Sequence, residues 1–423
     1  MMTMAEKILA RASGKEKVEP GEIVEAKVDR VMSHDNAAFV ARLFKKIGVD
    51  RVWNPERIII VLDHRVPAPN EQAAMGHKII REFVKEQGIK YFYDMKAGIC
   101  HQVMVEKGHA LPGNLIIGTD SHTTTYGALG VFSTGVGYTD MAAIWATGKT
   151  WLKVPETIKI NVEGKLPPMV FSKDVILHII GELTMDGATY KAVEFHGSTI
   201  RDMSIASRLV LSNMSMEMGA KVGLIPVDQK TEEYLKGRAK EEYTVLNPDE
   251  GCEYADVYKF NVENLEPQVA CPHTVDNVKP ISEVEGLPID QAVLGSCTNG
   301  RYEDLEIAAR ILEKAMKEGK RIHRDVRMIV LPASWDIYLK AMENGLLKTF
   351  IKAGAVVANS GCGPCMGSHL GILAKGERAI SSTNRNFRGR MGSKEAEVYL
   401  ASPATVAASA VEGVITDPRK YVG

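Results

Sequence analysis

The 423-residue sequence has few cysteines, no excess of charge of either sign and no long apolar run. Six cysteines are too sparse for a disulfide-stabilised scaffold. Fifty-two basic residues against fifty-three acidic ones give a net charge of −1, which argues against a nucleic-acid binder, whose basic face usually shifts the whole balance. No apolar run approaches the roughly 20 residues that cross a bilayer. These shortages favour a soluble globular protein.

The N-terminal stretch is predicted to be a helix rather than a targeting segment. Thr3 and Glu6 have the spacing of a capping box before Ile8 and Leu9, and Gly14 follows as a stop signal. The stretch contains acidic residues and lacks the apolar core of a signal peptide. Together with the sparse cysteines, this favours the reducing cytoplasm, where cysteines bind metals more often than they form disulfides.

Short apolar runs alternate with helix-like stretches along the whole chain, which is typical of α/β proteins with mainly parallel sheets. The predicted strands include Ile58–Leu62, Leu115–Ile117, Thr157–Val162, Ala292–Leu294, Met328–Leu331, Val356–Ala358 and Ala379–Ser381. The predicted helices include Glu71–Gln87, Met141–Leu152, Tyr302–Lys317 and Ala404–Val411. Changes in composition near Val154-Pro155 and within Pro280–Pro288 predict three α/β domains with the bounds 1–154, 155–283 and 284–423.

Reactive side chains follow the ends of five predicted strands. Ligands of open α/β sheets bind at the carboxyl ends of the strands, so these segments are expected to line one shared central cleft. The segments are Asp63-His64, Gly118–His122, Gly295–Gly300, Asn359–Cys365 and Ser382–Arg385.

Three cysteines lie in glycine-rich loops of this set. Cys362 and Cys365 belong to the segment Gly-Cys-Gly-Pro-Cys-Met-Gly, and Cys297 belongs to Gly-Ser-Cys-Thr-Asn-Gly. The glycines let the backbone fold around a bulky ligand and offer N–H groups to sulfur. Three thiolates predict either an iron–sulfur cluster with one open iron or a zinc site completed by a histidine such as His369. A third reading makes Cys297 a buried packing residue and the other two a redox or zinc pair.

Histidines, carboxylates and arginines complete the candidate site. His64, His101 and His122 can transfer protons near neutral pH, and a carboxylate partner fixes the tautomer and raises the pKa of each. Arg385 and Arg390 lie in the loop after a strand, and arginine binds carboxylates in a two-pronged fashion. A surface loop with counter-ions remains the alternative for the arginines.

The motifs together resemble the aconitase superfamily. They occur in the order of that family and cover essentially the whole chain. The matching phrases are Asp63-His64, Gly98-Ile-Cys-His-Gln102, Gly118-Thr-Asp-Ser-His-Thr123, Gly295-Ser-Cys-Thr-Asn-Gly300, Gly361-Cys-Gly-Pro-Cys365 and Asn384-Arg-Asn-Phe-Arg-Gly-Arg390.

The resemblance implies aconitase-like domains 1–3 around a cleft that holds one [4Fe–4S] cluster on Cys297, Cys362 and Cys365. It implies a hydro-lyase in which His101 donates a proton to the departing hydroxyl. It also implies the catalytic pairs Asp63 with His64, Asp120 with His101, and Glu217 with His122. The remaining implied residues are Ser121, Asn384, Arg385 and Arg390 in substrate binding, and Asn213 beside the cluster.

Two departures from aconitases refine the expectation. The chain ends soon after the third expected domain, so the domain that supplies the base for the carbon-bound proton is expected on a separate small subunit. His34-Asp35 stands where aconitases have Gln-Asp, as it does in large subunits of isopropylmalate dehydratase. We therefore expect the isomerisation of 2-isopropylmalate to 3-isopropylmalate in leucine biosynthesis.

Other functions remain as alternatives at this point. Homoaconitate, citrate or a dimethylmalate would undergo the same chemistry. A structural zinc-binding scaffold and a cluster-switched RNA binder belong to different classes. The near-zero net charge and the absence of basic runs weigh against the RNA binder.

Overall fold

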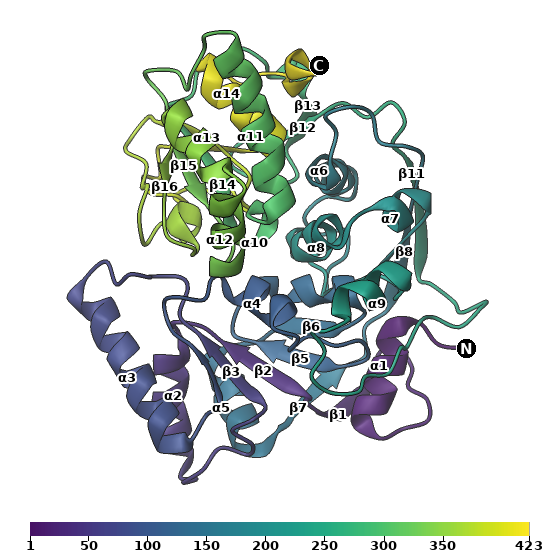
Figure 1. The fold of residues 1–423 in the computed structure, drawn as a ribbon. Coiled ribbons are helices and arrows are strands. Elements are labelled where there is room, and N and C mark those ends of the chain that lie inside the picture. The colour runs from purple at the N-terminus through teal and green to yellow at the C-terminus, as the bar shows by residue number, and fades with distance from the viewer. Residues whose placement is uncertain (423) are drawn as a thin grey trace.

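The structure, a computed structural model, describes residues 1–422 and has the predicted α/β architecture (Figure 1). Within these residues the strands form sheets of five, two, four and seven strands. No helix in this part of the chain is long and apolar enough to cross a membrane.

The first sheet is fully parallel and has the order β4-β3-β2-β5-β6. Chain order reverses between β2 and β5, and the carboxyl ends of strands at such a switch point are where ligands bind. Its strands are β2 (Arg30–Ser33), β3 (Ile58–Val61), β4 (Tyr91–Tyr93), β5 (Leu115–Gly118) and β6 (Phe132–Gly135). Its helices are α2 (Ala37–Ile47), α3 (Glu71–Gln87), α4 (Cys100–Glu106) and α5 (Tyr138–Thr147), with a 3₁₀ helix at Ser121–Leu129.

The N-terminal helix is confirmed. Helix α1 (Met4–Ser13) begins with the reciprocal capping box of Thr3 and Glu6 and ends at Gly14, whose φ is +70°. The two-stranded antiparallel sheet follows it along the chain, and its strands are β1 (Ile23–Lys27) and β7 (Lys149–Lys153).

The second sheet is parallel and has the order β10-β9-β8-β11. Its strands are β8 (Thr157–Glu163), β9 (Ala192–His196), β10 (Val222–Leu224) and β11 (Asp256–Asn261). Its helices are α6 (Ser172–Leu183), α7 (Ser198–Asp202), α8 (Ile205–Met214) and α9 (Gln229–Leu235), with a 3₁₀ helix at Ser215–Met218.

The third sheet has the order β13-β12-β18-β17-β14-β15-β16, in which β12 and β13 are antiparallel. Its strands are β12 (Gln268–Ala270), β13 (Val278–Pro280), β14 (Gln291–Gly295), β15 (Arg327–Leu331), β16 (Val356–Val357), β17 (Arg378–Ser381) and β18 (Glu397–Leu400). Its helices are α10 (Ser296–Asn299), α11 (Tyr302–Lys317), α12 (Trp335–Glu343), α13 (Leu346–Ala353) and α14 (Pro403–Glu412), with 3₁₀ helices at Ile281–Glu283, Gly363–Met366 and Pro418–Tyr421.

The three large sheets follow one another along the chain. Strands β12 and β13 pair with the third sheet, although they precede the boundary expected at residues 283 and 284. The domain bounds therefore stay a prediction. Helix α10 contacts both α4 and α8 near the middle of the molecule, which brings residues of all three sheets together there (Figure 1).

The predicted helix Met141–Leu152 is wrong in its second half. The helix ends at Thr147, because Gly148 adopts a left-handed conformation with φ +70°. Residues Lys149–Lys153 instead form β7, which pairs with β1. The other predicted strands and helices are present, with bounds that differ by a few residues.

Candidate functional site

The three cysteines are buried and free of disulfides, and two of them, Cys297 and Cys365, contact asparagine side chains. Asn213 on α8 and Asn384 after β17 both donate an amide N–H to Cys297 Sγ, at 3.3 and 3.4 Å. Cys365 Sγ lies 3.6 Å from Asn384 Oδ1. Asn384 also donates to Asn213 Oδ1 at 3.2 Å. The structure thus brings the second sheet's Asn213 to the cysteine loops of the third sheet, as expected for a residue beside a cluster.

The loop that carries Cys297 is held in a conformation that few residues tolerate. Gly295 has φ +146°, and a Cβ there would lie 2.4 Å from the carbonyl oxygen of Leu331. Ser296 has φ +73°, which is unusual for a residue other than glycine. Backbone strain of this kind persists only where the surroundings fix it, and it turns Cys297 into the space beside Asn213.

The donor set fits a cluster better than a single metal ion. Burial and then the charge of Cys365 raise the pKa of Cys297 to about 12, and burial raises the pKa of Cys362 as well. Such thiols give up their protons when cations bind, as cluster irons would. One zinc ion with bonds of about 2.3 Å would hold its thiolates roughly 3.8 Å apart. Within residues 1–422 the three sulfurs do not form a group of ligand atoms within 4.8 Å of one another.

The predicted zinc alternative with His369 is not formed in the described residues. The His369 ring lies 2.9 Å from the carbonyl oxygen of Pro67 through Nε2, and it belongs to no group of metal-ligating atoms there. His369 thus contacts a backbone carbonyl oxygen instead of the cysteines, which does not support it as a fourth ligand.

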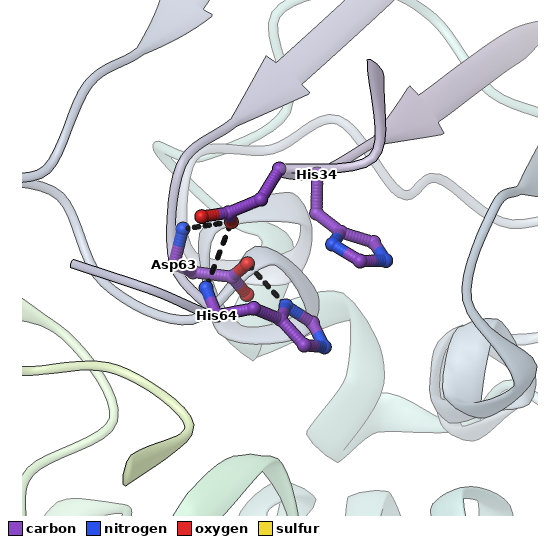
Figure 2. A group of neighbouring side chains, drawn as sticks. His34, Asp63 and His64 are labelled. Carbon is purple, nitrogen blue, oxygen red and sulfur yellow. Dashed lines mark hydrogen bonds and ion pairs between the residues drawn. The ribbon is translucent and has the colours of Figure 1, made fainter. Parts of the chain in front are cut away.

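His64 and Asp63 lie in a turn after β3, beside the cysteines. Figure 2 shows the contact between the His64 ring and the Asp63 carboxylate, which spans 2.6 Å from Nδ1 to Oδ1. His34 stacks on His64 with ring centroids 3.8 Å apart. Burial opposes protonation of His64, but the charges of Asp63 and Cys362 outweigh it and raise its pKa well above the usual range. His64 also lines a cavity of about 480 Å³.

The group of His34, Asp35, Asp63 and His64 could be taken for a second metal site, since its ligand atoms lie within 4.8 Å of one another. The carboxylate oxygens of Asp35 and Asp63 already accept hydrogen bonds from the protein. Asp35 accepts the backbone N–H groups of Asp63, His64 and Arg65, and Asp63 accepts that of Cys100 at 2.7 Å. These contacts explain the group as a hydrogen-bonded turn.

Asp120 joins the three candidate histidines. Its Oδ1 lies 2.8 Å from His101 Nε2 and 3.6 Å from His122 Nδ1, and its Oδ2 lies 3.5 Å from His64 Nε2. Burial would raise the pKa of Asp120, but hydrogen bonds from the histidines hold it well below the ordinary value. Because one carboxylate contacts all three rings, protonation of one histidine affects the protonation of the others.

A second carboxylate, Glu217, links His122 to Arg385. Its Oε1 lies 2.6 Å from His122 Nε2, and both of its oxygens accept from Arg385 Nε at 3.0 Å. Burial opposes ionisation of Glu217, yet these partners lower its pKa. All three pairs expected from the sequence are therefore in contact, while their roles in catalysis stay predictions.

The remaining predicted residues lie around this network. Ser121 begins the 3₁₀ helix after Asp120 and is partly exposed. Arg390 is partly buried, and its Nε has no hydrogen-bond partner within residues 1–422. An unpaired buried donor of this kind is costly unless an acceptor binds it, which suits a carboxylate ligand.

Sequence reasoning missed several buried residues that hold the site together. Tyr126 lies 3.0 Å from His101 Nδ1, and Arg301 donates to the carbonyl oxygens of Cys297 and Thr298 at 2.8 and 2.7 Å. Lys173 contacts the loop before Asn384. The one signal for Lys173 was a charged pair, Lys173-Asp174, directly before an apolar helical run.

Comparisons with known proteins agree with this site. A model of the Aconitase family (aconitate hydratase) matches residues 6–286 and 279–413. A 3-isopropylmalate dehydratase large subunit of Methanopyrus kandleri is 54% identical over 99% of both chains. A probable methanogen homoaconitase large subunit of Methanothermobacter thermautotrophicus is also 54% identical, over 100% of this chain and 99% of its own.

A solved structure shows the same fold at much lower similarity. The holo-form of aconitase X from Thermococcus kodakaraensis superposes with a TM-score of 0.51 at 12% identity, over 93% of this chain and 92% of its own. At this identity the likeness concerns the fold alone. The family model and the relatives, which match almost the whole chain, carry the assignment: the chain belongs to the aconitase family.

Proposed function

We propose that this chain is the large subunit of an isomerase that interconverts 2-isopropylmalate and 3-isopropylmalate by dehydration and rehydration. The observation that carries the proposal is the set of three buried free cysteines beside a connected network of three histidines and three carboxylates. Relatives at 54% and 51% identity over nearly the full length are named 3-isopropylmalate dehydratase large subunits, which supports the choice of substrate.

Cys297, Cys362 and Cys365 would hold one [4Fe–4S] cluster. When bound, a cluster with one iron not held by cysteine supplies a Lewis acid for hydroxyl and carboxylate oxygens. Asn213 and Asn384 donate N–H groups to sulfur and would stabilise thiolate charge.

His64 and His101 are the candidates for donating a proton to the leaving hydroxyl. The sequence resemblance favours His101, but both of its ring nitrogens have partners in the protein, Asp120 and Tyr126. His64 holds Asp63 with Nδ1, and its Nε2 meets Asp120 only at 3.5 Å, so this nitrogen is held more loosely than either nitrogen of His101. His64 also lines the cavity and has a raised pKa, which keeps a proton available. The geometry therefore favours His64 as the donor and His101 as the residue that orients Asp120.

Arg385 and Arg390 would bind the substrate carboxylates. Glu217 holds Arg385 through Nε alone, which leaves the two terminal nitrogens of the guanidinium for a two-pronged contact. The unpaired Nε of Arg390 supplies a further donor. Ser121, which is partly exposed, and Asn384, which directly precedes Arg385, would add neutral hydrogen bonds.

The base that removes the carbon-bound proton would come from a separate small subunit. Relatives that match nearly the whole chain are named large subunits, which supports a two-subunit enzyme. Within the network described above, every carboxylate already accepts hydrogen bonds from histidine, arginine or backbone N–H groups. A further base from a partner would complete the reaction.

Metal analysis tests the cofactor. Protein purified without oxygen should be brown, absorb broadly near ~400 nm and hold about four irons per chain. One zinc and no iron would contradict the proposal. Cys297→Ser should lose most of the iron, and unchanged iron in this variant would show that Cys297 is not a ligand.

The substrate is tested by reconstitution with the small subunit. The relative named homoaconitase is as similar as the first dehydratase, so homoaconitate is the second candidate. We expect the highest kcat/KM with isopropylmalate among isopropylmalate, homoaconitate and citrate. A higher kcat/KM with homoaconitate would replace the proposed substrate and leave the chemistry unchanged.

A further inference from the structure

Lys173 is a fully buried lysine that reaches from the second sheet's helix α6 into the third sheet's loops. It is the second residue of α6 and has no exposed surface. Its ammonium donates to the carbonyl oxygens of Ser382 and Thr383 at 2.6 and 2.7 Å and to Asn299 Oδ1 at 3.3 Å. All three of its N–H bonds are therefore directed at two loops of another sheet.

The acceptors of Lys173 belong to the two loops on which the proposed site depends. Ser382 and Thr383 directly precede Asn384, which contacts the sulfurs of both Cys297 and Cys365. Asn299 lies two residues after Cys297 in the same short helix, α10. The Lys173 ammonium thus connects the backbone that precedes Asn384 with the short helix that carries Cys297.

The charge of Lys173 has no carboxylate among its hydrogen-bond acceptors, which are two backbone carbonyl oxygens and one amide oxygen. The nearby carboxylates are engaged elsewhere. Asp174 accepts the backbone N–H groups of Gln268 and Phe171, and Asp304 accepts from Asn299 and Arg301. A buried unpaired ammonium is costly, so negative charge nearby has a large effect on it.

Part of the negative charge that acts on the Lys173 ammonium comes from the cysteines. Burial lowers the pKa of Lys173 to about 7, and the charges of Asp304, Cys297, Asp174 and Cys365 act in the opposite direction. Three thiolates with a bound oxidised [4Fe–4S] core form an anion. An anion at this place and a buried ammonium behind the loops stabilise each other.

We infer that Lys173 is a positioning residue of the cluster site, which holds the Cys297 loop and the Asn384–Arg385 loop in one arrangement and offsets the negative charge of the thiolates. This inference rests on the proposed function, because an anionic cluster is what the charge would serve. The competing explanation is that Lys173 only stabilises the packing of the second sheet against the third. The two explanations differ in whether the charge itself matters to the cluster.

Three variants of Lys173 separate charge from shape. Lys173→Met keeps the length of the chain and removes the charge, Lys173→Gln keeps a polar donor without charge, and Lys173→Arg keeps the charge. Lys221→Met is the matched control, because Lys221 is a partly buried lysine directly before β10 that packs on Tyr190 instead of the site. Each full-length chain is reconstituted anaerobically with iron and sulfide.

Two measurements on the reconstituted chains report on charge. The midpoint potential for one-electron reduction of the cluster should become more negative in Lys173→Met and Lys173→Gln, because a nearby cation favours the reduced form. Their absorbance near ~400 nm should also disappear about 10-fold faster in air, the scale expected when a residue supporting metal ligands is lost. Lys173→Arg should stay close to the wild type, and Lys221→Met should match it.

A third measurement needs no cluster. In the metal-free chain, amide hydrogen exchange of residues 295–300 and 382–385 should be faster in Lys173→Met than in the wild type, while exchange of the first sheet stays the same. If Lys173→Met fails to fold, the comparison of Lys173→Gln with Lys173→Arg decides in its place.

Two results would overturn the inference. One is a wild-type potential and rate of cluster loss in both Lys173→Met and Lys173→Gln. The other is a lower melting temperature with an unchanged potential, which would leave Lys173 a packing residue. A wild-type chain that binds no iron would overturn the proposed function instead, so the two failures can be told apart.

Discussion

The Asp35 carboxylate accepts four hydrogen bonds, and three of them come from the backbone of the turn that carries the proposed acid–base pair. Its oxygens lie 2.9, 2.8 and 3.1 Å from the nitrogens of Asp63, His64 and Arg65. The fourth contact is 2.9 Å from His77 Nε2. Asp35 touches no candidate ligand itself, but it fixes the backbone from which Asp63 and His64 project.

Replacement of Asp35 by asparagine should therefore weaken both the fold and the site. One carboxylate oxygen becomes an NH₂ group that faces backbone N–H donors, and buried donors without an acceptor cost about 1–3 kcal/mol each. We expect Asp35→Asn to lower the free energy of unfolding by roughly that amount in urea titrations. Asp325→Asn is the control, because the Asp325 side chain is 70% exposed and its loss should change stability by less than about 0.5 kcal/mol. Equal effects of the two substitutions would contradict this account.

The same carboxylate predicts a pH dependence. Burial would raise the pKa of Asp35, but the hydrogen bond from His77 and the charges of His64 and His34 lower it below the ordinary value. A lowered pKa contributes stability above the unfolded-state value near ~3.9, and this stability is lost as the pH falls below it. The difference in unfolding free energy between wild type and Asp35→Asn should shrink from pH 5 to pH 3, by at most about 1.4 kcal/mol per pH unit. A constant difference over this range would show that Asp35 keeps its ordinary pKa.

Substitution of the two candidate proton donors distinguishes their roles. His64→Gln should lower kcat by about 10²–10⁴-fold, the range for loss of a general acid. His101→Gln should have a smaller effect on kcat, since His101 contacts Asp120 and Tyr126 and would act by orienting the carboxylate. Iron content should be unchanged in both variants. The reverse order of the two effects would return the donor role to His101.

At the scale of the element, the loop after β14 shows why glycine is required beside Cys297. A methyl group on Gly295 would meet the Leu331 carbonyl oxygen at 2.4 Å, and φ +146° disfavours any side chain. We expect Gly295→Ala to destabilise the chain by at least about 2 kcal/mol in urea unfolding.

Gly76 is the matched control for this substitution. It lies inside helix α3, and a Cβ there has open space around it. Gly76→Ala should stabilise the chain by roughly 0.5–1 kcal/mol, because alanine loses less conformational freedom in a helix. Destabilisation of similar size in both variants would show that the clash at Gly295 is not the cause.

The elements that the sequence predicts well are those whose signals are local. The apolar runs of β3, β5, β14 and β17 and the capping box of α1 appear at the expected places. The error at Lys149–Lys153 has a different origin, since this strand exists through pairing with β1, more than 100 residues away. The hydrophobic periodicity and the composition of Lys149–Lys153 contain no information about a pairing strand so distant in the chain.

The same distinction holds for the site. Motif order placed the three cysteines and the three histidine–carboxylate pairs, all of which lie together. It named Asp35 without its role, and it could not place Lys173, whose backbone acceptors Ser382 and Thr383 are distant in the chain. Lys173 and Arg301 look like ordinary surface charges in the sequence.

At the scale of the whole molecule, the candidate site draws on all three large sheets. His64 and Asp120 follow strands of the first, Asn213 and Glu217 come from the second, and the cysteines come from the third. Contacts such as Asn213 to Cys297 and Arg385 to Glu217 therefore connect sheets that are far apart in sequence. A ligand that fixes these loops should stabilise the arrangement of the sheets as well as the loops.

Removal of the proposed cluster should therefore loosen the molecule locally and lower its melting temperature. A group that binds only the folded chain adds RT ln(1 + [L]/Kd) to stability, so iron chelation should reduce the melting temperature. Hydrogen exchange should increase at residues 295–300, 360–367 and 382–385, while β2, β3 and β5 keep their protection, since their apolar side chains are buried independently of the cysteines. Cys252→Ser should respond to chelation as the wild type does, because Cys252 is partly exposed and far from these loops in the chain. Chelation that leaves the melting temperature and all three segments unchanged would show that the cysteines hold no group that supports the fold.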